Sequence, residues 1–346
     1  MPPIILEVLK DIKDLFAELD QNRAARIIIT THHKPDGDAL GSSLALWKFL
    51  KNLGFDTRVV SPTDYGVHLQ WLPHQEHVVN YEMAHKEAKT LVEQADYIFC
   101  LDFNALHRIN ELGDIIRECK AKKIMIDHHQ EPEGFDDFRY WTTQTTSTAQ
   151  LVEEVIVMWK GKDAIDADIA TCLYTGIMTD TGSFRFDTVT PHTHRTVADL
   201  IEKGAKNSYI HQKVFDNFSF DRLQFIGYCL ANKLEVIPEL KTAVMSVTRE
   251  ELVRFNIQTG DTEGLVNYGL SIRGIEFSAL FIDRTKLVKI SFRGSGNFPC
   301  NEFSRDHFKG GGHYNAAGGQ STETLEEAVA RFKRTLPEYK KYLADQ

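Results

Sequence analysis

Four short segments of the sequence gather carboxylate and imidazole side chains, the groups that bind divalent cations. They read "HHKPDGDALG" (32–41), "CLDFN" (100–104), "MIDHHQ" (125–130) and "MTDTGSF" (178–184). Their candidate residues are His32, Asp36, Asp38, Asp102, Asp127, His128, His129 and Asp180. So many carboxylates in one place would repel one another and raise one another's pKa values unless cations neutralised them. We therefore expect two divalent metal ions.

The donor set also indicates the kind of metal and the chemistry. It is rich in oxygen, has few imidazoles and contains no thiolate, which suits Mn²⁺ or Mg²⁺ better than structural zinc. Paired divalent ions activate a bridging hydroxide for in-line attack on phosphorus, so the expected reaction is phosphoryl or phosphodiester hydrolysis. Simpler readings exist for single segments. "PDGD" is a good turn sequence, and Asp127 suits the orientation of a histidine as well as it suits metal binding.

The apolar runs before these segments predict how they are positioned. Four short β-rich runs predict strands at 26–31, 57–61, 97–102 and 123–127. One longer run, 41–54, has helical spacing and ends on a glycine, so it predicts a helix. Alternating strands and helices imply an α/β, doubly wound parallel sheet, whose ligands bind beyond the carboxyl ends of the strands. We expect Asp36 and Asp38 to share one side of an extended turn, with Gly37 allowing close approach.

The rest of the chain predicts further helices and a smaller domain. Ser147 and Gln150 form a capping-box pattern at the start of a helix, and 167–180 is also helical. A helical region around 191–236 precedes the β-rich segments, a glycine-rich loop and a C-terminal helix; the β-rich segments are 242–248, 275–282 and 286–293. We expect domains at 1–205 and 239–346, the second of α+β type, with a helical linker at 206–238.

The segment "FKGGGHYNAAGGQ" (308–320) is a second candidate site. Gly310, Gly311 and Gly312 permit positive φ and expose backbone N–H groups that suit a phosphate nest, and His313 adds a donor. Glycine runs also form flexible turns. Basic residues concentrate here, however: Arg284, Lys286, Lys289, Arg293, Arg305, His307 and Lys309. We therefore expect a local anion site.

The charge of the chain argues against long nucleic acid as a substrate. With 346 residues and a formal net charge of −9, the chain lacks the surplus of Lys and Arg that contacts to many phosphates require. An anionic substrate is therefore expected to be small. The five scattered cysteines form no CxxC pair, and the amphipathic residues 1–20 contain no signal or membrane segment. The expected location is the cytoplasm.

Five motifs, taken in order, resemble those of the DHH phosphoesterase superfamily with its DHH-associated C-terminal domain. They are "HHKPDGDALGS", "LDFN", "IDHH", "TDTGSFRF" and "GGGHYNAAGG". The resemblance spans almost the whole chain and points to the oligoribonuclease (nanoRNase) branch, whose members also dephosphorylate 3′-phosphoadenosine 5′-phosphate. It implies a metal-binding DHH domain, a smaller substrate-binding domain and an active site in the cleft between them. The implied activity is hydrolysis of short oligoribonucleotides to mononucleotides.

The resemblance also implies roles for particular residues. One Mn²⁺ would be held by His32, Asp36 and Asp102, and the other by Asp38, Asp102, His128 and Asp180, with Asp102 bridging; Mg²⁺ is the alternative ion. His129 would face the substrate beside the catalytic Asp102 and His128. The far phosphate or terminal nucleotide would be bound by Arg293, Gly310, Gly311, Gly312 and His313. Lys309 stands where the family often has a fourth glycine. The implied binding partners are short RNA oligonucleotides and nucleotides, and neither long duplex nucleic acid nor a membrane. The protein is expected to be a monomer or a homodimer.

Other functions match parts of the sequence. A family II inorganic pyrophosphatase shares the first four motifs, but its C-terminal domain carries a Ser-Arg-Lys (SRK) signature. The nearest match in this chain is Ser304, Arg305 and Asp306, which lacks the lysine, and the GGGH segment is present instead. A single-strand DNA exonuclease of the superfamily usually has a longer chain and a further nucleic-acid-binding domain. A phosphodiesterase of cyclic or linear dinucleotides (cyclic di-AMP, pApA) is the runner-up. A catalytically silent nucleotide-binding module is a further alternative. It is disfavoured because every expected metal-ligand position is filled in this chain, which a silent module would not require.

Overall fold

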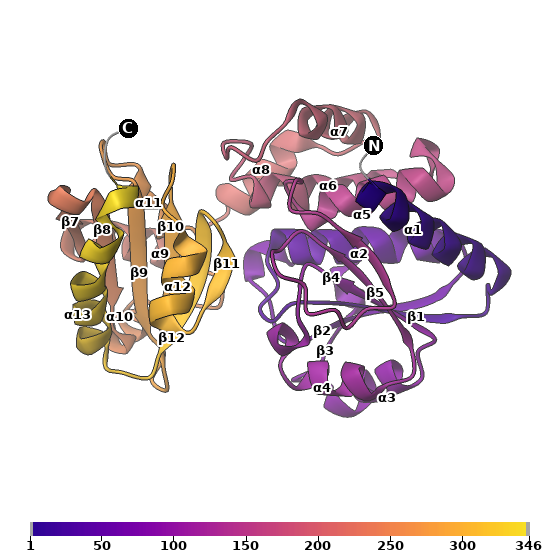
Figure 1. Ribbon diagram of the computed structural model, residues 1–346, viewed down its shortest axis with the longest axis horizontal. Coiled ribbons are helices and arrows are strands. Elements are labelled where there is room, and N and C mark those ends of the chain that lie inside the picture. Colours follow the sequence, from indigo (N-terminus) through magenta and orange to yellow (C-terminus); the bar gives the residue numbers. More distant parts are fainter. Residues whose placement is uncertain (1–2, 344–346) are drawn as a thin grey trace. The chain divides into compact units, whose positions relative to one another are not determined.

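The computed structural model describes residues 3–343, and the chain divides into two compact units, Met1–Asn217 and Phe218–Gln346 (Figure 1). Each unit contains a sheet of its own. The helical stretch that the sequence places between the domains is shared by both units, because α8 belongs to the first and α9 to the second. Within residues 3–343, the helices include none with the length and apolar character needed to cross a membrane.

The first unit is built on a six-stranded sheet with the order β3-β2-β1-β4-β5-β6, and every pair in it is parallel. The strands are β1 Arg26–Thr31, β2 Asp56–Ser61, β3 Val78–Asn80, β4 Tyr97–Leu101, β5 Lys122–Asp127 and β6 Phe138–Trp141. This confirms the predicted doubly wound α/β sheet and the four predicted strands. The two outermost strands, β3 and β6, were not predicted, because each is short and only half-buried.

Helices cover both faces of this sheet. They are α1 Pro3–Gln21, α2 Gly37–Asn52, α3 His85–Glu93, α4 Glu111–Glu118, α5 Thr148–Lys160, α6 Ala167–Asp180, α7 Pro191–Glu202 and α8 Asn207–Phe215. Alternate residues of a strand point to opposite faces, so Ile27 and Ile29 pack with the core under α2, α5 and α6, while Ile28 packs with the core under α3 and α4. In Figure 1 these two groups of helices lie on opposite sides of the sheet.

Helices α2 and α6 pack closely through glycines. A Cβ atom on Gly41 of α2 would lie 2.5 Å from the Cys172 carbonyl oxygen of α6, and one on Gly176 of α6 would lie 2.9 Å from Asp38 Oδ1. The missing side chains therefore let the two helix backbones approach each other. This contact brings the N-terminal end of α2 next to α6.

The second unit has a six-stranded mixed sheet with the order β11-β12-β10-β9-β8-β7, in which only the β8–β9 pair is parallel. The strands are β7 Leu234–Ile237, β8 Thr242–Val247, β9 Phe277–Asp283, β10 Val288–Gly294, β11 Gly311–His313 and β12 Ala316–Ser321. The helices are α9 Phe220–Asn232, α10 Arg249–Arg254, α11 Asn267–Leu270, α12 Cys300–Phe308 and α13 Leu325–Thr335. The predicted second, smaller α+β part is thus present.

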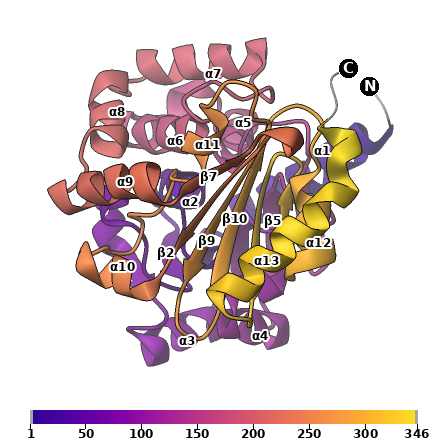
Figure 2. The ribbon, with the colours of Figure 1, turned by 90° about the vertical axis from the view of Figure 1, so that its left-hand side faces the viewer.

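Two apolar cores hold the second sheet. Six phenylalanines of β9, β10, α12 and α13 pack on one face, and residues of α9 and α10 pack on the other. The phenylalanines are Phe277, Phe281, Phe292, Phe303, Phe308 and Phe332. Figure 2 shows α13 lying across the sheet and α9 and α10 along its other side.

The glycine segment differs from the predicted loop. Gly311 and Gly312 belong to strand β11, which pairs with β12 and is the outermost strand of the sheet in the described part of the chain. A Cβ on Gly310 would lie 1.9 Å from the Gly318 carbonyl oxygen, and one on Gly312 would lie 2.6 Å from that of Ala316. The glycines are thus needed for close packing of two backbones, which local turn propensity could not reveal.

Candidate metal centre

The sequence-predicted ligands of the first unit meet at the carboxyl ends of the central strands. His32 follows β1, Asp102 follows β4, and Asp127 ends β5 and is followed by His128 and His129. Strands β1 and β4 are neighbours where the chain order of the sheet reverses. That reversal is the switch point at which doubly wound sheets bind their ligands. Two helix ends complete the arrangement, because Asp38 lies in the first turn of α2 and Asp180 is the last residue of α6.

The expected extended turn at Asp36 and Asp38 is a helix start. Asp36 is the N-cap of α2, and its Oδ1 accepts hydrogen bonds from the backbone N–H groups of Asp38 and Ala39, both at 3.0 Å. Aspartate is among the best N-cap residues, so this side chain stabilises the helix that carries Asp38. The expected close approach at Gly37 does occur, since a Cβ there would lie 2.4 Å from Thr179 Oγ1.

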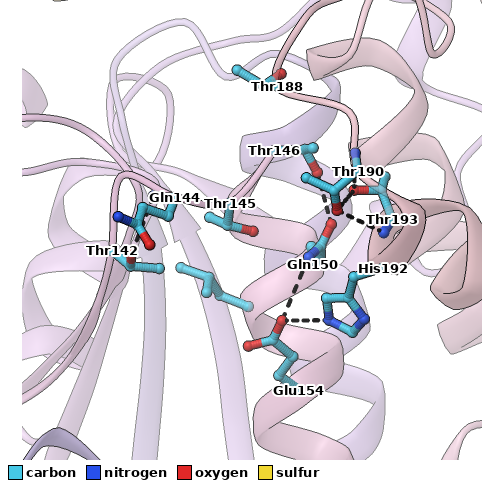
Figure 3. A pocket seen from close by; sticks show the side chains of 11 residues that line it. Thr142, Gln144, Thr145, Thr146, Gln150, Glu154, Thr188, Thr190, His192 and Thr193 are labelled. Carbon is cyan, nitrogen blue, oxygen red and sulfur yellow. Dashed lines mark hydrogen bonds and ion pairs between the residues drawn. The ribbon is translucent and has the colours of Figure 1, made fainter. Parts of the chain in front are cut away.

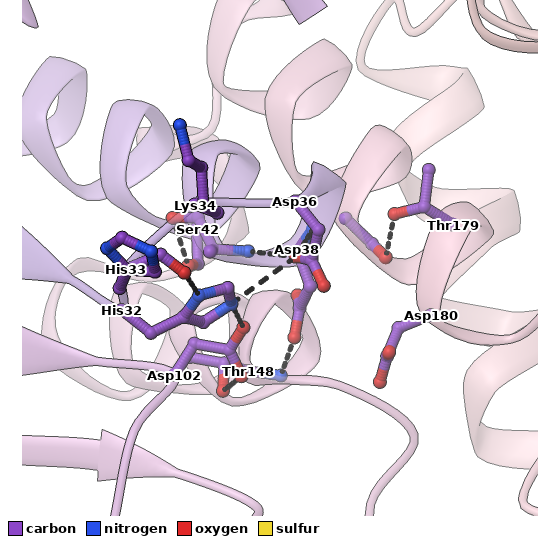
Figure 4. Close-up of polar contacts among 12 residues, drawn as sticks. His32, His33, Lys34, Asp36, Asp38, Ser42, Asp102, Thr148, Thr179 and Asp180 are labelled. Carbon is purple, nitrogen blue, oxygen red and sulfur yellow. Dashed lines mark hydrogen bonds and ion pairs between the residues drawn. The ribbon is translucent and has the colours of Figure 1, made fainter. Parts of the chain in front are cut away.

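The donor atoms form two groups that share Asp102. His32, Asp36 and Asp102 each place one ligand atom within 4.8 Å of the others, and so do Asp38, His128 and Asp180. Asp102 Oδ2 lies 3.5 Å from His32 Nε2, while its Oδ1 lies 3.4 Å from His128 Nε2. His128 Nε2 is also 3.4 Å from Asp180 Oδ2. The two oxygens of Asp102 therefore face donors of different groups, as those of a carboxylate that holds two cations would. Figure 4 shows Asp102 beside His32 and Thr148.

Thr148, at the N-terminus of α5, donates hydrogen bonds to candidate ligands of both groups. Its hydroxyl donates to Asp102 Oδ1 at 2.9 Å, and its backbone N–H donates to Asp38 Oδ2 at 2.7 Å. The backbone N–H of Ala149 donates to the other oxygen of Asp38 at 2.8 Å. Asp38 and Asp102 are 1% and 2% exposed, so these bonds replace water that the carboxylates have lost.

Asp127 orients His129. Its Oδ1 lies 2.8 Å from His129 Nδ1, and the side chain is completely buried. Trp141 of β6 donates its indole N–H to the His129 carbonyl oxygen at 2.6 Å, which also holds this segment. Of the two interpretations that the sequence leaves open for Asp127, this contact favours orientation of the neighbouring histidine. A carboxylate behind an imidazole is the usual outer support of a metal or substrate site.

The protonation of the site shows that it suits cations. Burial and the neighbouring Asp102 and Asp180 raise the pKa of Asp38 well above its usual range. Burial alone would lower the pKa values of His32 and His128, but Asp102 and the other nearby carboxylates outweigh it and raise each to about 10. Without a metal ion, protons on Asp38, His32 and His128 thus balance the negative charge of the buried carboxylates. Divalent cations would do the same with stronger ligation, so the buried oxygen and imidazole donors fit two such ions.

His129 behaves differently from the other two histidines. Burial, together with the positive charge of Arg108, lowers its pKa well below the usual range. Burial and Asp102 raise the pKa of Asp127 to about 6. At neutral pH the His129 imidazole is therefore uncharged, and Asp127 holds one of its ring nitrogens.

Sequence reasoning missed Thr148 as a residue of the site. The signal was indirect: the predicted capping pattern at Ser147 is present, because Ser147 Oγ accepts from the Gln150 N–H at 3.1 Å. The second half of the box is replaced, because Gln150 Oε1 accepts from the Thr146 hydroxyl at 2.9 Å. A helix start has free N–H groups that attract carboxylates, but the sequence does not say which carboxylate they meet.

The expected substrate-binding residues lie in the second unit. In the strand register both Arg293 of β10 and His313 of β11 are opposite Ala316 of β12, so the two lie two strands apart, about 10 Å. Gly310, Gly311 and Gly312 precede His313 on the same edge. The glycines and His313 therefore lie at the edge of the second sheet, whereas Arg293 lies two strands inward in the same sheet.

A separate pocket of about 170 Å³ lies beside the start of α7 in the first unit. Threonines such as Thr145 and Thr190 line it, and Glu154 and His192, whose side chains are 3.0 Å apart, close one side (Figure 3). Neither lysine nor arginine contributes to its lining. It includes none of the sequence-predicted site residues.

The fold and the donor groups define a two-unit α/β protein with a candidate dinuclear metal centre at the switch point of its parallel sheet. Comparison with protein families agrees with this description. The family model for the DHH family, N-terminal domain, matches residues 26–177, and the model for the DHHA1 domain matches residues 240–339. The chain belongs to the DHH family. The resemblance read from the motifs is thereby confirmed.

Individual relatives agree over most of the chain. The bifunctional oligoribonuclease and PAP phosphatase NrnA of Thermus thermophilus is 30% identical, covering 91% of this chain and 92% of that protein. The Bacillus subtilis protein of the same name is 24% identical, covering 87% and 91%. Among solved structures, an exopolyphosphatase-related protein from Bacteroides fragilis superposes with a TM-score of 0.91 at 38% identity, covering 97% and 98%.

Proposed function

We propose that the protein is a divalent-metal-dependent phosphoesterase that hydrolyses short oligoribonucleotides to mononucleotides. We propose in addition that it converts 3′-phosphoadenosine 5′-phosphate to AMP and that Mn²⁺ is the ion it uses. The single observation that carries the proposal is the position of Asp102, whose two oxygens face the two donor groups at 3.5 and 3.4 Å. The names of the Thermus thermophilus and Bacillus subtilis relatives support this choice of substrates.

The chain's own residues would divide the work as follows. His32 and Asp36 would hold one cation, Asp38, His128 and Asp180 the other, and Asp102 both. Bound divalent cations would supply Lewis acidity toward the phosphate and toward the water that attacks it. Asp127 keeps the neutral His129 ring in place beside them. Arg293, Gly310, Gly311, Gly312 and His313 would bind a phosphate or nucleotide end of the substrate.

A substrate panel tests the proposal. The purified full chain with Mn²⁺ is offered an RNA dinucleotide, an RNA pentanucleotide, a long RNA, 3′-phosphoadenosine 5′-phosphate, cyclic di-AMP, pyrophosphate and polyphosphate. We expect the short RNAs and 3′-phosphoadenosine 5′-phosphate to be hydrolysed fastest, because an acidic chain with a local anion site has little attraction for long RNA. Preferential hydrolysis of cyclic di-AMP would favour the dinucleotide phosphodiesterase instead, and equal cleavage of long RNA would contradict the proposal.

Asp102→Asn is the control that ties the activity to this site. The substitution removes a ligand from both proposed cations, so turnover should be abolished and both Mn²⁺ ions lost in direct metal analysis. Turnover within about tenfold of the parent enzyme would refute the bridging role.

A further inference from the structure

A second cluster of metal-binding side chains lies in the first unit, on the segment between β2 and β3. His74, Glu76 and His77 each place one ligand atom within 4.8 Å of the others. Glu76 and His77 belong to a short 3-10 helix, Gln75–His77, and His74 precedes it in a left-handed conformation with φ of 68°. None of these residues takes part in the candidate metal centre.

The cluster has the geometry of a small-ion site. His77 Nε2 lies 3.6 Å from Glu76 Oε1. Two ligands of a tetrahedral zinc ion are roughly 3.3 Å apart, because each bond is about 2.0–2.1 Å long. A shift of a few tenths of an ångström would therefore bring these two donors to a shared ion. Two imidazoles with a carboxylate are also a ligand set that zinc uses.

Side chains of α2 and α6 contact the two imidazoles before any ion binds. The Trp47 ring of α2 lies 5.1 Å from both His74 and His77, between centroids, and its indole N–H donates to the Thr57 carbonyl oxygen. Asp168 of α6 lies 2.9 Å from His74 Nε2. The rings therefore lose little conformational freedom on binding, which favours affinity.

We propose that His74, Glu76 and His77 form an accessory site for a borderline transition-metal ion, with Zn²⁺ as the best match. Imidazole donors favour Zn²⁺ over Mn²⁺, so the site would differ in preference from the oxygen-rich centre at Asp102. It is also distant from that centre: Trp47 lies about 13 Å along α2 from Asp38, at 1.5 Å per residue. The ion would stiffen the 74–77 segment, whose imidazoles already contact Trp47 of α2 and Asp168 of α6.

The test compares zinc binding by three full-length proteins with Mn²⁺ present throughout: the parent, His77→Ala and His192→Ala. His77 and His192 are equally exposed, at 52%, and each lies beside a glutamate, but no second imidazole is grouped with His192 among the described residues. Equilibrium dialysis should show one Zn²⁺ fewer per chain for His77→Ala and no loss for His192→Ala. Equal zinc content in all three proteins, or the same loss in both variants, would overturn the proposal.

A second measurement uses the tryptophan that touches both rings. Ni²⁺, which quenches indole fluorescence at close range, should quench part of the emission of the parent and of His192→Ala. The apparent affinity in this titration should fall at least about tenfold in His77→Ala and in Glu76→Gln, because each lacks one ligand. Glu76 is 61% exposed, so its substitution leaves folding intact. Quenching that is unchanged in both variants would place the ion elsewhere.

Discussion

At the scale of single residues, Thr148 is the side chain that links the two donor groups of the candidate centre. Thr148→Val keeps its shape and backbone N–H but removes the hydroxyl that donates to Asp102 at 2.9 Å. We expect Mn²⁺ affinity to fall about 10- to 100-fold, because a bond that supports a ligand is lost while all the ligands remain.

Titration of activity with Mn²⁺, paired with calorimetric Mn²⁺ binding, measures this effect. Excess Mn²⁺ should restore most of the turnover of Thr148→Val, and Thr148→Ser should resemble the parent because it retains the donor. An unchanged Mn²⁺ dependence would mean that the hydroxyl does not support the metal ligand.

Glu153 gives a residue-scale prediction for pH. It is only 5% exposed on α5, and burial, with a smaller effect of Glu154, raises its pKa to about 7. In the unfolded chain its pKa is near 4.5. Between these values the folded state binds more protons than the unfolded state, so stability falls as pH rises from about 4.5 to 7.

Glu153→Gln removes this cost. The variant should gain on the order of 3 kcal/mol over the parent at pH 8, and the gain should disappear below about pH 4.5, where both states of the parent are protonated. Urea unfolding of both proteins at the two pH values measures the difference. A gain of the same size at both pH values would show that ionisation of Glu153 is not its cause.

At the scale of elements, the close contact of α2 and α6 positions three of the candidate ligands. Asp36 and Asp38 lie at the start of α2 and Asp180 at the end of α6. Gly41→Ala would place a methyl group 2.5 Å from the Cys172 carbonyl oxygen, which is backbone and cannot turn away. The helices must separate, so we expect a loss of about 1–3 kcal/mol in the free energy of unfolding and weaker Mn²⁺ binding.

Gly227→Ala is the matched control, because Gly227 is also a helical glycine but a Cβ there meets no atom within 4 Å. This control should be stabilised by roughly 0.5–1 kcal/mol through helix propensity, with Mn²⁺ binding unchanged. Thermal unfolding with and without Mn²⁺ separates the two variants. If Gly41→Ala were as stable as the parent, α2 and α6 could move apart without a loss of stability, and the close contact would not be required.

At the scale of the whole molecule, the two units are expected to contribute differently to catalysis. The candidate metal ligands lie in the first unit, whereas His313 lies in the second. We expect His313→Ala to retain its Mn²⁺ and to raise KM for an RNA dinucleotide, with a loss of about 1–3 kcal/mol in transition-state binding. Bis-p-nitrophenyl phosphate, which contains no nucleotide for His313 to bind, should be hydrolysed almost as before.

Steady-state kinetics with both substrates and a metal analysis decide this prediction. If His313→Ala loses its Mn²⁺ and its hydrolysis of the small ester, His313 acts with the metal ligands. The proposed division of labour between the units would then be wrong.

The sequence determined the local features of this protein. Runs such as residues 26–31 and 97–102 are short and apolar, and they form β1 and β4. Such a run is buried in a sheet whichever strands lie next to it, so its own sequence is enough to predict a strand. The chemical types of the residues after them, His32 and Asp102 among others, were also readable directly. Since parallel strands share one carboxyl edge, their convergence followed from the fold class.

Only the tertiary structure decided which distant groups meet. Thr148 and Asp38 are 110 residues apart in the chain, and nothing local in either segment identifies the other. The strands β3 and β11 have three residues each, so their own propensity is weak and they exist through pairing with β2 and β12. Pairing, register and helix contacts are long-range, and their free energy appears only when the partner surfaces are already folded.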